Sequence, residues 1–199
     1  MLNVLARARL SVVLDPIGRV LARAGASPDL ITIVGTVGVV VGAVGFVARG
    51  HLLTGMIIVA VSVLTDMLDG AVARARGGGS AWGALLDSTM DRIADGAAFG
   101  SLAFWLARTD RPAAAAAALL CLLGAFTVSY VKARAEGLGL RCDVGIAERT
   151  ERLLVAGAGA ILSLFGVPYA LEAGLWVLVV LCIITVGQRL HAVRRQVAG

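Results

Sequence analysis

The chain has 199 residues, of which 59% are hydrophobic and only 16% are charged, and its mean hydropathy is +0.90. A soluble domain carries about 25% charged residues, so this composition excludes an ordinary soluble fold as well as intrinsic disorder. The net charge is +5, and the three cysteines form no CxxC pair, which excludes a disulfide scaffold and predicts small apolar packing residues at Cys121, Cys142 and Cys182.

Residues 1–24 interleave apolar side chains with arginines. This pattern predicts an amphipathic interfacial helix, with its apolar side in the acyl boundary and its arginines among anionic head groups. A signal peptide is the alternative, but arginines interrupt the apolar run and no A-x-A cleavage site follows it. Pro28 then predicts a turn before the first membrane span.

Six apolar stretches follow, and a helix that spans a bilayer needs roughly 20 mostly apolar residues. They cover residues 30–47, 52–72, 85–106, 113–131, 153–164 with its flanks, and 170–186. The sequence therefore predicts an all-α integral membrane fold with six transmembrane helices. Residues 1–199 are predicted to form a single membrane domain, whose six-span core covers residues 28–190.

The distribution of lysine and arginine predicts the orientation in the membrane. Fourteen of the eighteen cations fall in the N-terminal segment, in the loops after spans two and four, and in the C-terminal tail. Only Arg49, Arg108 and Arg111 fall on the opposite side, and Arg92 lies within span three. Both termini are therefore predicted to be cytoplasmic, and the positive charge reflects topology rather than binding to nucleic acid.

Spans two and three carry four aspartates in two helical pairs. Asp66 and Asp69 are three residues apart, and Asp87 and Asp91 are four apart, so each pair shares one helix face. An ionised carboxylate in a membrane costs about 2.5–3.5 kcal/mol on insertion scales. A compensating divalent cation makes such a cluster tolerable, and an all-oxygen ligand set selects Mg²⁺, Mn²⁺ or Ca²⁺. Two such ions clamp a phosphoryl group in substitution chemistry.

Glycines surround these aspartates. Gly70 follows Asp69 directly, Gly77-Gly78-Gly79-Ser80 opens the turn between the helices, and Gly83 lies one turn before Asp87. Missing side chains allow a ligand to approach the backbone, and Arg74 can pair with a phosphate. The alternatives are a merely flexible glycine loop, and aspartates that cap helices or pair with neighbouring arginines.

These residues resemble the signature of the CDP-alcohol phosphotransferase family. The matching positions are Asp66, Asp69, Gly70, Ala73, Arg74, Gly83, Asp87 and Asp91, all at the family's spacing. Members transfer a phosphatidyl-type group from a CDP-linked lipid to an alcohol and release CMP. The resemblance implies that the four aspartates hold two metal ions, Mg²⁺ or Mn²⁺, and that Asp91 is also the base for the acceptor hydroxyl.

The resemblance also implies a binding site for the CDP-linked lipid. The segment from Ser27 to Thr32 looks like the family's Pro-Asn-x-x-Thr segment, with Asp29 in place of the usual asparagine. The residues expected to bind the CDP-lipid are Asp29, Leu30, Ile31, Thr32, Gly70, Arg74 and Ser80. Asp95 continues the spacing of Asp87 and Asp91 by one turn. It is expected to support the site by pairing with Arg134 or Lys132, or to form an interhelical hydrogen bond.

Segments 129–134 and 148–152 resemble those of family members whose acceptor is inositol 1-phosphate. The resemblance implies that the acceptor phosphate is bound by Ser129, Lys132, Arg134, Arg152 and Arg189, with Arg149 nearby. The topology rule alone explains most loop arginines, and this alternative stays open. The expected protein is a homodimeric plasma-membrane enzyme that uses CDP-diacylglycerol and an inositol phosphate. The alternatives are a synthase that uses glycerol 3-phosphate and, in a different class, a cation transporter.

Overall fold

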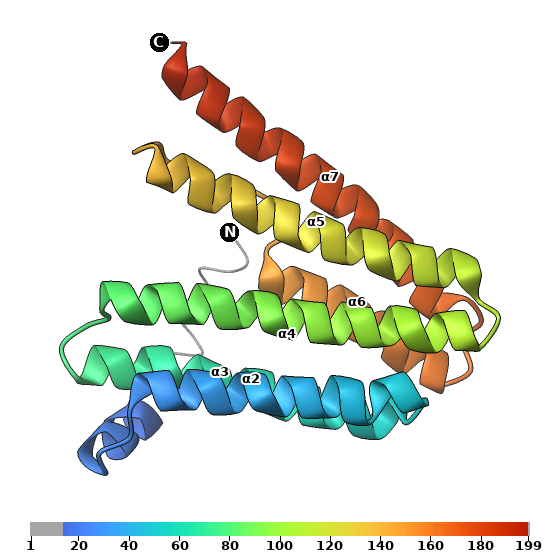
Figure 1. Ribbon diagram of the computed structural model, residues 1–199, viewed down its shortest axis with the longest axis horizontal. Coiled ribbons are helices and arrows are strands. Elements are labelled where there is room, and N and C mark those ends of the chain that lie inside the picture. The colour runs from blue at the N-terminus through green and yellow to red at the C-terminus, as the bar shows by residue number, and fades with distance from the viewer. Residues whose placement is uncertain (1–13, 199) are drawn as a thin grey trace. The chain divides into compact units, whose positions relative to one another are not determined.

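A computed structural model describes residues 14–198, apart from the side chain of Asp66, and these residues form helices and no strand (Figure 1). The prediction of an all-α fold is confirmed for this part of the chain. The elements in chain order are α2 (Pro28–Gly45), the short 3₁₀ helix η1 (Val47–Arg49), α3 (Leu52–Ala75), α4 (Ala81–Arg108), α5 (Pro112–Gly137), α6 (Arg149–Leu164) and α7 (Ala170–Val197).

The chain divides into two compact units, one that ends at Ala98 and one that begins at Phe99. In the first unit α2 packs against α3, and in the second α5 and α6 each pack against α7 (Figure 1). The single membrane domain expected for residues 1–199 stays a prediction.

Four of the helical segments are long and apolar enough to cross a membrane: Pro28–Arg49, Leu52–Ala75, Pro112–Gly137 and Ala170–Val197. The other two expected spans differ for physical reasons. Helix α4 has 28 residues but carries three aspartates and an arginine between positions 87 and 95. Helix α6 has only 16 residues and is about 24 Å long, shorter than the roughly 30 Å hydrocarbon core. Four candidate spans therefore meet this criterion of length and composition among the described residues, and six spans stay a prediction.

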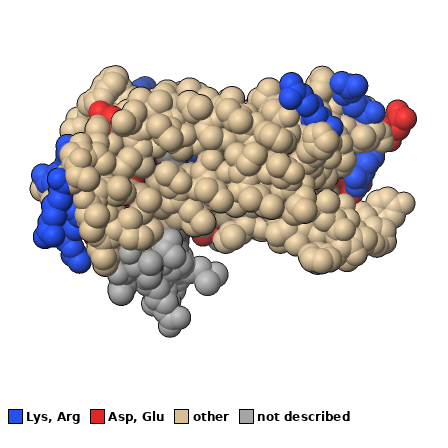
Figure 2. Space-filling view, turned by 90° about the horizontal axis from the view of Figure 1, so that it is seen from below, with Lys and Arg blue, Asp and Glu red and all other residues tan. Residues whose placement is uncertain are grey.

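The apolar helices expose large hydrophobic side chains on continuous faces. On α2, Val34, Val37, Val41 and Val44 are each at least 50% exposed and follow the three- and four-residue spacing of one helix face. On the face drawn in Figure 2, most of the surface is uncharged and lysine and arginine gather in separate groups. Extended apolar faces of this kind suit contact with lipid rather than water.

The N-terminal residues that the structure describes are also helical, over positions 14–23. Ile17 and Val20 are exposed apolar residues, and Arg19 and Arg23 are exposed cations on the same short helix. Residues 1–13 of the predicted amphipathic helix lie outside the described residues, and its placement at the membrane interface stays a prediction.

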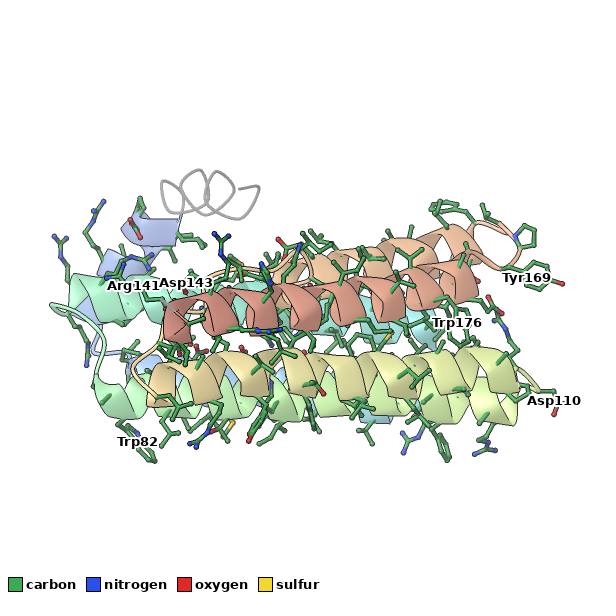
Figure 3. All side chains as sticks on the ribbon, turned by 90° about the horizontal axis from the view of Figure 1, so that it is seen from above. Trp82, Asp110, Arg141, Asp143, Tyr169 and Trp176 are labelled. Carbon is green, nitrogen blue, oxygen red and sulfur yellow. The ribbon has the colours of Figure 1, made fainter. Side chains whose placement is uncertain are left out.

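The loops of the second unit lie at its two ends. Figure 3 places Asp110 and Tyr169 toward one end and Arg141 and Asp143 toward the other. The connections before α5 and before α7 therefore share one end, and the loop after α5 lies at the opposite end. This is the alternation that the lysine and arginine distribution predicts for these loops.

The packing of α5 against α7 depends on small residues. Cys121 and Cys182 are buried, and Cys121 Sγ donates to the Leu175 carbonyl at 3.2 Å. Cys142 is buried as well, and none of the three cysteines forms a disulfide. The prediction that the cysteines pack as small apolar residues is confirmed. A Cβ atom at Gly124 would lie 2.7 Å from Cys182 Cβ, so glycine is required there.

Gly124→Val is accordingly expected to destabilise the protein. Overpacking of a close contact costs about 1–3 kcal/mol, and we expect a lower midpoint of thermal unfolding in detergent. Gly187→Ala on α7 is the control, because nothing lies within 4 Å of a Cβ at that position. Equal midpoints for the two variants would show that α5 and α7 have room to separate at Gly124.

Candidate active site

In the first unit, a hydrogen bond between two helices orients one signature aspartate. Thr32 on α2 is buried, and its Oγ1 donates to Asp69 Oδ2 on α3 at 2.5 Å. The other oxygen, Asp69 Oδ1, accepts from the backbone N–H of Gly70. Both carboxylate oxygens therefore have donors that fix the rotamer of Asp69.

Thr32→Val is expected to lower turnover roughly 10–100-fold, the usual cost of losing a group that orients a metal ligand. Valine keeps the volume and removes the hydroxyl, so the fold is preserved. We expect a weaker apparent affinity for Mg²⁺ in a turnover assay, with partial recovery at high Mg²⁺. Thr36→Val, a second buried α2 threonine one turn further on, is the control. An unchanged Mg²⁺ dependence would contradict the orienting role of Thr32.

The other signature carboxylates lie on α3 and α4. The backbone of Asp66 is helical within α3, but its side chain is outside the described residues. Asp87 is exposed and Asp91 is half-buried on α4. Among the described side chains, no group of three acidic, histidine or cysteine residues is close enough to hold a metal ion. The donor chemistry nevertheless fits Mg²⁺ or Mn²⁺, because all four candidate ligands offer carboxylate oxygens.

Arg92 links Asp91 to a deeper carboxylate. Arg92 Nη2 lies 3.6 Å from Asp91 Oδ2 and 3.7 Å from Asp95 Oδ2. Asp95 is only 1% exposed, so it does not face lipid. The sequence suggested Lys132 or Arg134 as its partner. The structure places Arg92 beside Asp95, whereas Lys132 contacts Asp143 and Glu136. Asp95 therefore has a cation beside it on its own helix, and its expected pairing with Arg134 or Lys132, or an interhelical hydrogen bond, stays a prediction.

The start of α4 lies beside the start of α2. Trp82 Nε1 donates to Asp29 Oδ2 at 3.1 Å, and a Cβ at Gly83 would lie 3.8 Å from Asp29 Oδ1. Ser80 Oγ accepts from the backbone N–H of Gly83 at 2.9 Å, which caps the helix. Asp29 and Ser80, two predicted CDP-lipid residues, are therefore brought together. Leu30 is 59% exposed, and Ile31 is half-buried.

The helix at residues 14–23 covers the signature segment of α3. Gly18 lies against Ala71, since a Cβ at Gly18 would be 2.7 Å from the Ala71 backbone. One turn away, Arg74 Nη2 donates to Asp15 Oδ1 at 2.8 Å. The Arg74 side chain is 58% exposed, which leaves it accessible to a phosphate. A Cβ at Gly70 would lie 3.4 Å from Arg74 Nη1, so Gly70 gives the guanidinium room.

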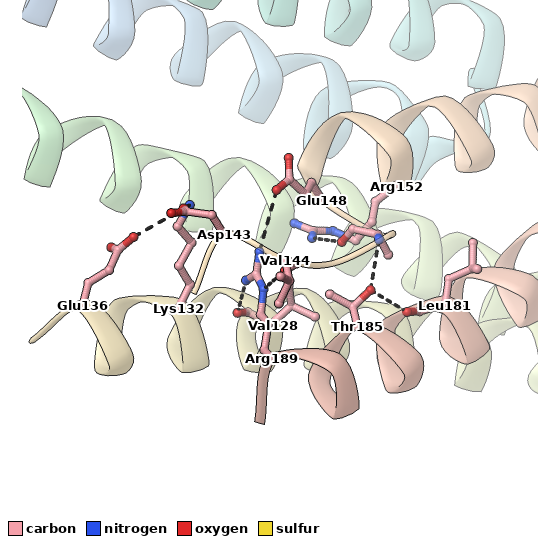
Figure 4. A network of polar contacts seen from close by, with 11 residues as sticks. Val128, Lys132, Glu136, Asp143, Val144, Glu148, Arg152, Leu181, Thr185 and Arg189 are labelled. Carbon is pink, nitrogen blue, oxygen red and sulfur yellow. Dashed lines mark hydrogen bonds and ion pairs between the residues drawn. The ribbon is translucent and has the colours of Figure 1, made fainter. Parts of the chain in front are cut away.

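In the second unit, three of the cations predicted to bind the acceptor gather around residues 143–148, which we call the α5–α6 loop (Figure 4). Lys132 Nζ on α5 lies 3.1 Å from Asp143 Oδ1. Arg152 Nη1 on α6 donates to the Ala147 carbonyl at 3.1 Å. Arg189 Nε on α7 donates to the Val144 carbonyl at 2.8 Å.

Arg189 and Arg152 are both buried, at 3% and 2% exposure. Arg189 Nη1 also donates to the Val128 carbonyl at 2.5 Å, and its Nη2 lies 4.0 Å from Glu148 Oε1. Arg189 thus joins α5, the α5–α6 loop and α7. Ser129 follows Val128 on α5 and is half-buried, as is Arg149 on α6, whereas Arg134 is exposed.

Several residues of these sites carry no signal that the sequence alone reveals. The Asp15 partner of Arg74 and the Trp82 partner of Asp29 lie outside the signature. Thr185 on α7 is a further residue of this kind. Its Oγ1 accepts from the Ala147 N–H at 3.0 Å and donates to the Leu181 carbonyl at 2.8 Å. Apart from the bond to Leu181 within α7, these contacts join residues that are distant in sequence, and periodicity does not report such pairs.

Comparison with known proteins agrees with the signature. The sequence profile of CDP-alcohol phosphatidyltransferases matches residues 26–187. A phosphatidylinositol phosphate synthase of Mycobacteroides abscessus is 47% identical over 196 residues, covering 98% of this chain and 89% of that protein. The Streptomyces avermitilis phosphatidylinositol phosphate synthase is 45% identical over 206 residues, covering 100% of this chain and 84% of that protein.

A solved structure shows the same fold. It is the Mycobacterium tuberculosis phosphatidylinositol phosphate synthase with CDP-DAG bound, and it aligns with a TM-score of 0.84 and 48% identity. The alignment covers 91% of this chain and 93% of that chain. A second structure of that protein, in complex with manganese and citrate, aligns with a TM-score of 0.84 and 49% identity. It covers 90% of this chain and 88% of that chain.

Proposed function

Because the chain belongs to the CDP-alcohol phosphatidyltransferase family, we propose that it makes phosphatidylinositol phosphate from CDP-diacylglycerol and inositol 1-phosphate. The observation that carries this proposal is its 45–47% identity, over nearly the whole chain, to phosphatidylinositol phosphate synthases of two genera. Family membership makes the protein a transferase rather than the cation transporter that intramembrane aspartates alone would allow.

We propose that Asp66, Asp69, Asp87 and Asp91 hold the metal ions of this reaction, two Mg²⁺ or Mn²⁺. The support is the all-carboxylate donor set, the fixed rotamer of Asp69, and the manganese in the related structure. When bound, such ions neutralise charge on the phosphate under attack and on the leaving CMP.

The CDP-diacylglycerol is proposed to lie along the starts of α2 and α4 and the end of α3. The residues assigned to it are Asp29, Leu30, Ile31, Thr32, Gly70, Arg74 and Ser80. Arg74 supplies an exposed guanidinium for a phosphate. Asp29 is held by Trp82, and it leaves an acceptor oxygen for the hydrogen-bond donors of the nucleotide.

Asp91 is proposed as the general base. It accepts the proton of an inositol hydroxyl, whose oxygen then bonds to the phosphorus that carries diacylglycerol. The bond from that phosphorus to the CMP oxygen breaks, and CMP leaves with the bonding electron pair. The Arg92 guanidinium lies 3.6 Å from Asp91 and places a positive charge beside this carboxylate.

The acceptor phosphate is proposed to bind Ser129, Lys132, Arg134, Arg152 and Arg189. Charge complementarity supports this assignment, because a buried guanidinium is costly unless an anion or several acceptors compensate it. Arg189 donates hydrogen bonds from Nε and Nη1 to the backbone carbonyls of Val144 and Val128. Its Nη2 is too far from Glu148 for a hydrogen bond, and it is the group we expect to donate to the phosphate.

We further propose a homodimer in the plasma membrane, with six spans and both termini cytoplasmic. The lysine and arginine distribution supports this orientation. The exposed apolar faces of α2 and α7 offer surface for lipid and for a second subunit.

The experiment is a Mg²⁺-dependent assay of CMP release by the purified protein in vesicles, with inositol 1-phosphate, inositol and glycerol 3-phosphate as acceptors. We expect CMP release with inositol 1-phosphate and little with inositol, because unphosphorylated inositol leaves the cations without an anion. A preference for glycerol 3-phosphate would assign the protein to the alternative acceptor. No CMP release with any acceptor would overturn the proposal.

A further inference from the structure

A second basic site lies away from the signature aspartates, between the helix at residues 14–23 and the end of α3. It is a cleft of about 260 Å³ lined by Arg19, Ala22, Arg23, Ala75 and Arg76, which we call the arginine cleft. Three of the five lining residues are arginines, and none is acidic. The cleft is large enough for a phosphate and part of the group attached to it.

The geometry of the short helix aims its cations at this cleft. Arg19, Ala22 and Arg23 are spaced three and four residues apart, so they share one helix face. The small side chains of Ala22 and Ala75 keep the space between the arginines open. The contact of Gly18 with Ala71 holds the helix against α3 at this point.

Asp15, the acidic residue on the same short helix, contacts an arginine outside the cleft. Asp15 accepts a hydrogen bond from Arg74, so this carboxylate balances the signature arginine and not the cleft. Three guanidinium groups around one cleft repel one another. An anion with several oxygens relieves that repulsion, and guanidinium groups bind phosphate oxygens in a planar, paired geometry.

The surroundings favour a lipid as the source of the phosphate. Ile17 and Val20 on the same helix are exposed apolar residues, at 43% and 64%. A helix with exposed apolar and cationic side chains suits the boundary between acyl chains and head groups. We propose that the arginine cleft binds the head-group phosphate of an anionic phospholipid, separately from the substrates.

Such a lipid would affect the neighbouring residues that are assigned to CDP-diacylglycerol. The helix that forms one wall of the cleft also carries Asp15, which holds Arg74. Occupation of the cleft would therefore fix this helix on α3 and keep Arg74 in place for CDP-diacylglycerol.

The test uses the full chain in a neutral detergent, titrated with a fluorescent phosphatidylglycerol. Each cation at an anionic lipid surface changes affinity roughly fivefold, so Arg19→Gln/Arg23→Gln is expected to weaken binding about 25-fold. The matched control is Arg194→Gln/Arg195→Gln. It removes the same charge from the last turn of α7, on the side also predicted to be cytoplasmic. If both double variants weakened lipid binding equally, the loss would be due to net charge alone, and the proposal would be overturned.

A second variant tests the cleft without changing charge. Ala75→Phe fills the space and keeps all three arginines, and it is expected to weaken the same binding. Unchanged binding would contradict the cleft as the site. Inorganic phosphate that displaces the probe at equal concentration would identify a free anion as the ligand and overturn the lipid assignment. Because the readout is binding, its result stands even if the proposed transferase activity fails.

Discussion

Asp91→Asn is expected to have the largest effect of any single substitution. Removal of a positioned general base costs roughly 10²–10⁴-fold in rate, and the loss of a metal-ligand charge adds to it. Asparagine preserves the volume of the side chain, so the protein is expected to fold. The measurement is kcat for CMP release in Asp91→Asn, together with Mn²⁺ binding followed by electron paramagnetic resonance.

Asp110→Asn is the matched control for this change. Asp110 is exposed on the loop before α5 and has a φ of 55°, a backbone conformation that asparagine tolerates. We expect wild-type kcat and Mn²⁺ binding in this control. If Asp91→Asn bound Mn²⁺ fully and turned over at the wild-type rate, Asp91 would be neither base nor ligand.

Arg152→Gln is the second substitution with a large expected effect. A hydrogen bond to a charged group contributes about 1.5–3 kcal/mol, so kcat/KM for inositol 1-phosphate should fall at least about tenfold. Glutamine can still donate to the Ala147 carbonyl that Arg152 contacts, which limits damage to the α5–α6 loop. The KM for CDP-diacylglycerol is expected to stay the same, because its assigned residues are on other helices.

Arg141→Gln controls for the loss of one cation near the start of α6, because Arg141 is exposed and its backbone is held by Gln196. A purely structural role for Arg152 would lower the unfolding midpoint and raise the KM of both substrates together. That outcome would mean that the basic residues around the α5–α6 loop serve membrane topology alone.

The sequence predicted the helices well and their ends less well. Helix α5 continues to Gly137 and α7 to Val197, beyond the apolar stretches that ended at residues 131 and 186. The added residues include Lys132, Arg134 and Glu136, which are good helix formers. Hydropathy marks where a helix leaves the hydrocarbon, whereas hydrogen bonding along the backbone decides where it ends.

The signature residues could be found from spacing alone, since Asp69, Asp87 and Asp91 lie on helices as their spacing requires. Their partners could not be found in this way. Thr32 and Asp69 are 37 residues apart, and Arg189 and the Val128 carbonyl are 61 apart. Such pairs depend on which helices pack together, and the uniformly apolar helices of a membrane protein carry little information about their neighbours.

Cys121, Cys142 and Cys182 are all buried, so the native thiols are expected to react little with thiol reagents. A cysteine placed at one exposed position would then be the only reactive thiol, with no need to replace the native ones. In sealed vesicles, a membrane-impermeant maleimide would label Arg49→Cys or Arg141→Cys only where it faces the outer solution. The two variants should be labelled in opposite vesicle orientations. Because the three native cysteines are buried, such labelling would measure the topology directly.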